Sequence, residues 1–272
     1  MPMTSDHLAV LTLRLVLLRV VLNGLEVLLG RRADYQESGI FSWIVTKADR
    51  SWTSSGKIAG LLDPGMEYPN YLWLVGLQFA CALLILPVHG NIQWVLLLIV
   101  LAIEFLTTLR YCIYGTDGSD GMHLIVLCAI VLYSSFSTAT ARLIVLWFIA
   151  LTAMVAYFAA GVGKLLNPAW RNGTAIEIVM MSENRGNRTL ARWISRIPHL
   201  NQLICWSTIA FECCFPFVVF LGPTATLILL SCGIVFHFSI AASMGLNGFF
   251  WSFIATYPAV FRLALDLHSL SH

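Results

Sequence analysis

Long apolar segments recur along this chain and leave few folds open to it. A helix that crosses a bilayer needs roughly 20 apolar residues, and runs of that order occupy most of the sequence. The predicted spans cover residues 8–29, 70–88, 92–112, 122–136, 141–163, 202–221, 223–243 and 246–263. The sequence therefore predicts an all-α fold, a polytopic transmembrane helical bundle of about eight spans, with seven or six as the alternatives. The short fourth span could be tilted or re-entrant.

Composition identifies lipid as the main solvent of this surface. Of 272 residues, 58% are hydrophobic and 11% are charged, whereas soluble domains average about 25% charged residues. The net charge of +2 is small and scattered, so we expect membrane lipids as partners and no nucleic acid. The first span has no small-residue cleavage site and is not expected to be a cleaved signal peptide. Residues 1–272 read as a single transmembrane domain with no soluble domain at either end.

The seven cysteines do not suggest redox chemistry. All lie within or at the ends of apolar segments, and none forms a C-x-x-C pair. A thiol oxidoreductase would need such a pair or an equivalent exposed one. Packing between helices is the simpler interpretation of these small side chains.

Two polar segments, 30–69 and 164–201, separate the spans and read as loops. In the second, Arg188, Arg192 and Arg196 recur every fourth residue, and apolar residues lie away from that row. This pattern predicts an amphipathic helix over 187–199 that lies in the membrane interface; packing of the same apolar face on the bundle is the alternative. The two loops hold five and six of the 16 basic residues. The positive-inside rule would therefore make their side cytoplasmic and leave both termini outside.

Several ionisable groups fall at membrane depth, where they are costly and usually face the bundle interior. Arg19 and Glu26 are seven residues apart and share a helix face, whereas Glu104 and Arg110 are turned away from each other and need partners on other helices. Buried pairing that fixes helix register is one interpretation of such groups, and an internal cavity is the other. The full set is Arg14, Arg19, Glu26, Glu104, Arg110, Glu212 and His237.

Lys164 follows a run of small residues at 159–163 that permits close helix contact. Partial burial at this point would make the charged ammonium less favourable relative to the neutral amine, and the neutral amine could act as a base. A lysine at the end of a span ordinarily extends to the headgroups instead. Both interpretations stay open on the sequence alone.

The segment 157–173 resembles the signature of the vitamin K-dependent γ-carboxylase-like superfamily, the horizontally transferred transmembrane (HTTM) domain. Further resemblances follow in family order and extend over essentially the whole chain. The signature elements are Tyr157, Ala160-Gly161, Lys164, Trp170 and Gly173; the others are Asp63 and Tyr68, the Gly115–Asp120 turn, Glu212 with Pro216, His237, Met244-Gly245-Leu246 and Phe249-Phe250.

This resemblance implies a role for Lys164. In the carboxylase, the corresponding lysine is held to deprotonate reduced vitamin K, so a quinone is a possible cofactor. The chain lacks the carboxylase's large extracytoplasmic domain and is closer in length to stand-alone bacterial members, which include a sporulation-delaying-peptide maturation protein. The resemblance also implies a bacterial cytoplasmic membrane location, with both loops and Lys164 extracytoplasmic and the termini inside, opposite to the charge rule.

Three functions remain in view. The preferred one is an enzyme or maturation factor that acts on a peptide or lipophilic small molecule in an intramembrane cavity. The alternatives are a quinone-dependent, carboxylase- or epoxidase-like redox enzyme and a non-catalytic lipid-binding or toxin-immunity protein. No second histidine accompanies His237 at helical spacing, so we expect no metal site. The expected catalytic residues are Lys164, Glu212 and His237, with Glu212 offset from Lys164 or protonated; the expected substrate-binding residues are Trp170, Asp117, Asp120 and Glu104.

Overall fold

The computed structural model describes residues 4–48, 56–111, 118–183 and 186–270, and these form helices and connecting segments without a strand. Seven of its segments are long and apolar enough to cross a membrane. The predicted all-α polytopic bundle is therefore confirmed, and the protein is an integral multi-pass membrane protein. The seven segments are α1 (Ser5–Leu29), α6 (Asn91–Tyr111), α7 (Gly118–Ser135), α8 (Ala139–Leu166), α12 with η2 (Leu200–Phe220), α13 (Pro223–Met244) and α14 with α15 (Asn247–Leu270).

The remaining predicted span, 70–88, is a shorter helix. Helix α5 runs from Asn70 to Leu84 and has 15 residues, fewer than the roughly 20 of a typical span. The predicted short span at 122–136 is instead an uninterrupted helix of 18 residues, α7. Thus the count of eight consists of seven full-length segments and one short apolar helix within the described part of the chain.

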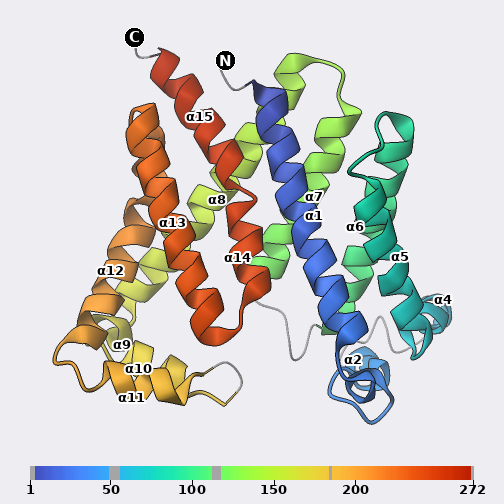
Figure 1. The fold of residues 1–272 in the computed structure, drawn as a ribbon, viewed down its shortest axis with the longest axis horizontal. Coiled ribbons are helices and arrows are strands. Elements are labelled where there is room, and N and C mark those ends of the chain that lie inside the picture. The colour runs from blue at the N-terminus through green and yellow to red at the C-terminus, as the bar shows by residue number, and fades with distance from the viewer. Residues whose placement is uncertain (1–3, 49–55, 112–117, 184–185, 271–272) are drawn as a thin grey trace. The chain divides into compact units, whose positions relative to one another are not determined.

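The chain divides into two compact units. Unit 2 comprises Val10–Arg142, and unit 1 comprises Met1–Ala9 with Leu143–His272. In unit 2, α5 and α6 pack as neighbours, α7 packs on α6, and two shorter helices lie at one end of these spans (Figure 1). Those two are α2 (Trp43–Ala48) and α4 (Gly56–Met66).

The segment 30–69 is more structured than a loop, which corrects the prediction. Besides α2 and α4 it contains the 3-10 helix η1 (Arg32–Tyr35), and the Asp63-Pro64-Gly65 sequence, which is typical of a turn, lies inside α4. Tertiary contacts explain the difference, because Asp63 accepts hydrogen bonds from Trp43 Nε1 at 2.7 Å and from Lys47 Nζ at 2.9 Å. These bonds fix α4 against α2 and override the turn preference of the Asp-Pro-Gly sequence.

Unit 1 contains α8, α12, α13, α14 (Asn247–Ile254) and α15 (Tyr257–Leu270). Helix α12 (Leu200–Cys214) continues as the 3-10 helix η2 (Phe215–Phe220), whose second residue is Pro216. Proline has no backbone N–H to donate and so breaks the regular α-helical pattern at this point. The predicted last span, 246–263, is likewise two helices in succession rather than one.

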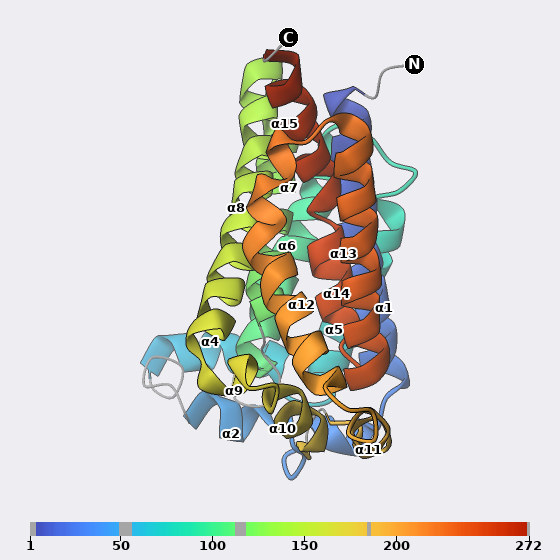
Figure 2. The ribbon, with the colours of Figure 1, turned by 90° about the vertical axis from the view of Figure 1, so that its left-hand side faces the viewer.

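The segment 164–201 is also helical rather than a loop. Helices α9 (Pro168–Arg171), α10 (Ala175–Met181) and α11 (Arg188–Ile194) lie across one end of α12 and α13 (Figures 1 and 2). An apolar cluster that includes Ile176, Ala191, Ile194 and Cys205 joins them to α12. The predicted amphipathic helix is present but shorter, because it ends at Ile194 instead of residue 199. Arg188 and Arg192 of this helix are exposed, as are Trp193 and, beyond the end of the helix, Arg196.

Candidate functional site

Helices α8 and α12 lie in close contact at Gly161. A β-carbon added at Gly161 would lie 2.7 Å from the backbone nitrogen of Cys213 and 2.8 Å from its sulfur. Only glycine allows this approach, so the predicted close helix contact in the 159–163 run is confirmed at this position. Tyr157 and Lys164 lie one turn on either side, on the same face of α8, because their spacings are four and three residues.

Lys164 and Glu212 form an ion pair across this contact. The lysine Nζ lies 2.8 Å and 2.7 Å from the two carboxylate oxygens. The Glu212 side chain is buried, and Lys164 is 22% exposed. The two residues are brought together as predicted. Glu212 was expected to be either offset from Lys164 or protonated; the contact rules out the offset, and a protonated Glu212 stays a prediction. An unpaired carboxylate inside the apolar bundle would be costly, and the ammonium is the cation that compensates it.

Trp170 completes this group of side chains. The Lys164 Nζ lies 5.1 Å from the centre of the Trp170 ring, within cation–π range. The local sequence explains the geometry: α8 ends at Leu166, and the Asn167 side chain caps α9 by accepting a bond from the Ala169 backbone N–H at 2.9 Å. Pro168 then occupies the first position of α9, where its fixed φ is favourable. The chain thereby reverses direction, which places the Trp170 ring next to the Lys164 ammonium.

Gly173 is the second position at which the local geometry requires glycine. Its φ is +82°, and an added β-carbon would lie 2.9 Å from the backbone of Gln202 in the first turn of α12. Both the left-handed conformation and the close contact favour glycine. The Trp206 Nε1 donates to the carbonyl of Arg171 at 3.2 Å and fastens the same segment to α12.

His237, on α13, belongs to a second polar group, which also includes Tyr157 of α8. Its Nε2 is hydrogen-bonded to the Tyr157 hydroxyl, which lies 2.7 Å from the Tyr257 hydroxyl. All three residues are buried, and the His237 ring stacks on Phe253 with centroids 4.8 Å apart. Gly233 leaves room for the Tyr257 hydroxyl, because a β-carbon there would overlap it.

The sequence prediction included His237 but missed Tyr257. The signal that could have found it is a tyrosine within an otherwise apolar span, since a buried phenol usually has a hydrogen-bond partner. The three predicted catalytic residues thus lie in two groups: Lys164 with Glu212 and Trp170, and His237 with the two tyrosines. Tyr157 and Lys164, two turns apart on α8, link these groups.

The other predicted binding residues that the structure describes, Asp120 and Glu104, lie in unit 2. Arg19 on α1 donates to the carbonyl of Ser119 at 2.9 Å and pairs with Asp120. Glu104 accepts a bond from Gln78 Nε2 at 2.6 Å. Asp117 lies outside the described residues.

Glu104 and Arg110 do have partners on other elements, as predicted. Besides its bond to Gln78 on α5, Glu104 lies near His123 on α7. Arg110 donates to the carbonyls of Met66 and Tyr35, the last residues of α4 and η1.

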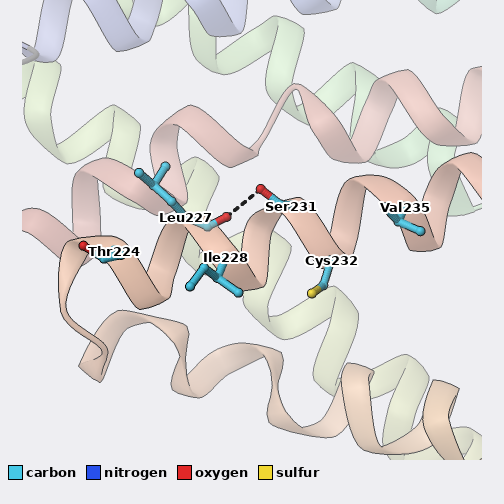
Figure 3. A pocket seen from close by; sticks show the side chains of 6 residues that line it. All are labelled: Thr224, Leu227, Ile228, Ser231, Cys232 and Val235. Carbon is cyan, nitrogen blue, oxygen red and sulfur yellow. Dashed lines mark hydrogen bonds between the residues drawn. The ribbon is translucent and has the colours of Figure 1, made fainter.

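An open depression of about 530 Å³ lies along the outer face of α13 (Figure 3). The lining side chains follow one stripe of that helix and are mostly apolar, which suits contact with acyl chains. Ser231 donates to the carbonyl of Leu227 at 2.8 Å and so hides its hydroxyl. None of the predicted site residues lines this depression; the lining residues are Thr224, Leu227, Ile228, Ser231, Cys232 and Val235.

Comparison with known proteins gives no match: no family model, no curated protein and no solved structure matches this chain.

Proposed function

We propose that this protein is a membrane enzyme or maturation factor whose reacting centre is the Lys164–Glu212 pair. The observation that carries the proposal is the bidentate contact of the Lys164 ammonium with a buried carboxylate, at 2.7 and 2.8 Å. The pair lies near the end of α8, beside the helices α9–α11. A peptide or a lipophilic small molecule could reach a site at this level from the lipid phase.

The chemistry we propose is proton abstraction by Lys164. An ammonium has no free electron pair, so Lys164 must first pass a proton to Glu212. That transfer converts two charged groups into a neutral amine and a neutral carboxylic acid, which apolar surroundings tolerate better than separated charges. The amine then takes a proton from the substrate, and a positioned base of this kind typically contributes about 10²–10⁴-fold to a rate.

Trp170 and His237 have supporting roles in this proposal. The Trp170 ring face lies over the Lys164 Nζ and would form one wall for a flat or apolar substrate group. His237 bonds to Tyr157 rather than to Lys164, so we assign it a positioning role through α8. Membership of the HTTM superfamily is part of the proposal, and its support is that Tyr157, Gly161, Lys164, Trp170 and Gly173 all take part in these contacts.

A non-catalytic role is the second candidate, and one observation favours it. Both oxygens of Glu212 engage the ammonium, as expected of a pair that only fixes α8 against α12. In that case the protein would bind lipid or another membrane protein without reaction.

The reactivity of the lysine amine distinguishes the two candidates. The sequence has three lysines, and Lys47 is a matched control for Lys164: their side chains are 24% and 22% exposed, and each is bonded to a carboxylate. The protein in lipid nanodiscs would be pulse-labelled with acetic anhydride near neutral pH, and acetylation read at each lysine by mass spectrometry. If Lys164 acts as a base, it should be acetylated several-fold faster than Lys47. Equal or slower labelling of Lys164 favours the structural role.

A second experiment addresses the reaction itself. Lys164→Arg keeps the positive charge, but its guanidinium does not deprotonate. Membrane extracts from cells that express the wild type and from cells that express this variant at equal level would be compared by mass spectrometry. We expect at least one lipid or peptide species that changes with the wild type only; identical extracts would count against catalysis.

A further inference from the structure

The interior of unit 2 holds a polar group that the proposed function does not use. It consists of Gln78 on α5, Glu104 on α6 and His123 on α7, each at most 5% exposed. Their helices are neighbours in the bundle (Figure 1). Polar side chains this deeply buried in a membrane protein usually have a function or a fully satisfied network, and this network is not fully satisfied.

The orientation of Glu104 follows from its neighbours. Gln78 Nε2 lies 3.4 Å from the carbonyl of Val100 and 2.6 Å from Glu104 Oε2. Since a carbonyl only accepts hydrogen bonds, the amide nitrogen must face both groups, and Oε2 is therefore an acceptor. The other oxygen, Oε1, lies 3.5 Å from His123 Nε2.

His123 has unused hydrogen-bonding capacity. Its side chain is 1% exposed, and within the described part of the chain neither ring nitrogen has a hydrogen-bond partner. A neutral imidazole carries one N–H and one lone pair. Glu104 Oε1, 3.5 Å from Nε2, is a group that could share a proton with the ring, and a small side-chain shift would bring the two atoms to hydrogen-bond distance.

The charges around the pair fix how many protons it holds. Arg19 on α1 and Asp120 on α7 form an ion pair that is neutral as a whole. Lys47 on α2 is bonded to Asp63, Arg110 lies six residues along α6 with its donors on backbone carbonyls, and Tyr71 on α5 is uncharged at neutral pH. Without a proton the Glu104–His123 pair would be anionic, and with two it would be cationic. Each charged state costs several kcal/mol in an apolar interior.

We propose that Glu104 and His123 form a proton-binding site that holds one exchangeable proton between Oε1 and Nε2. When the proton is on Oε1, the carboxylic acid and the imidazole are both neutral. When it moves to Nε2, a carboxylate faces an imidazolium and the net charge is unchanged. The site takes up a proton in the membrane interior independently of Lys164, so it stands whether or not the proposed reaction occurs.

Infrared and nitrogen NMR spectroscopy test this site on the whole protein in lipid nanodiscs at neutral pH. We expect either the C=O band of a protonated carboxylic acid that is lost in Glu104→Gln, or an imidazolium ¹⁵N signal that is lost in His123→Gln. Glu67→Gln, at an exposed glutamate, should leave both signals unchanged. Should either variant fail to fold, Glu212→Gln removes the other buried glutamate of the described residues. In that variant, ¹³C-labelled glutamate and ¹⁵N-labelled histidine report whether a buried carboxylic acid or an imidazolium is still present. Spectra in which every glutamate is ionised and every buried histidine is neutral would overturn the proposal.

Discussion

Gly161 on α8 lies so close to Cys213 on α12 that a β-carbon would come within 2.7 Å of the Cys213 backbone nitrogen. One turn further along, the same two helices hold Lys164 and Glu212 at ion-pair distance. The glycine therefore sets the separation on which the charged pair depends. If α8 and α12 were further apart, the distance between the Lys164 ammonium and the Glu212 carboxylate would increase, and these two groups have little access to water.

Gly161→Ala should destabilise the protein, because the added methyl group must push the two helices apart. Overpacking of this kind costs about 1–3 kcal/mol. Gly163→Ala is the matched control, since nothing lies within 4 Å of a β-carbon at Gly163. That change should be neutral or slightly stabilising, as alanine is the better helix former by up to about 1 kcal/mol. Thermal unfolding in detergent micelles measures both, and similar midpoints for the two variants would contradict the close-contact argument.

Arg110→Met should be strongly destabilising. The Arg110 side chain is fully buried, donates to the carbonyls of Met66 and Tyr35, and lies with its guanidinium carbon 4.2 Å from the centre of the Tyr71 ring. Methionine leaves both carbonyls without these donors, at about 1–3 kcal/mol each. Arg14→Met, at an exposed position of α1, should change the midpoint little. Equal effects at the two arginines would show that Arg110 does not hold the ends of η1 and α4.

Asp63 should make the stability of unit 2 depend on pH. The hydrogen bond from Trp43 Nε1, and then the contact with Lys47, hold the pKa of the Asp63 carboxyl below its ordinary value. A carboxyl whose pKa is lower in the folded state stabilises the protein above about pH 4, and this contribution is lost as the pH falls through the folded-state pKa. Asp63→Asn should therefore be less stable than the wild type at neutral pH and approach it in acid. A difference between the two unfolding midpoints that does not change with pH would contradict this assignment.

The two ends of the chain should lie on the same side of the membrane. The start of α1 and the end of α15 both belong to unit 1 and lie at the same end of it (Figures 1 and 2). The chain must then cross the membrane an even number of times. Since seven segments of the described residues are long enough to cross, the short helix α5 should be the eighth crossing. Alkaline phosphatase fused at Ser269, and a cysteine introduced at Ser5 and probed with a membrane-impermeant thiol reagent, should report one common side. Opposite sides would mean that α5 does not cross, and activity at Ser269 would also contradict the orientation implied by the HTTM resemblance.

The spans were largely predictable because their signal is local. Helix formation in lipid requires only a sufficiently long apolar run, since every backbone group is satisfied within the segment. The polar segments 30–69 and 164–201 were read as loops because their helices depend on distant contacts, such as that of Asp63 with Trp43. The prediction brought Lys164 near Glu212, with the carboxyl either offset or protonated, but did not foresee the close two-oxygen contact. Tyr257 was missed because its partner, Tyr157, is 100 residues away in sequence.

Helix α8 is longer than a bilayer requires. Its 28 residues extend about 42 Å at 1.5 Å per residue, against a hydrocarbon thickness of about 30 Å. Its apolar part, between Arg142 and Lys164, extends about 32 Å by the same rise. Tilting reduces the thickness that this part spans, and α8 does run obliquely past α12 (Figure 2). The acyl-chain length of the surrounding lipid therefore becomes a structural variable: a thicker bilayer would make α8 more upright, rotate it about its crossing point at Gly161, and change the depth at which Lys164 meets Glu212.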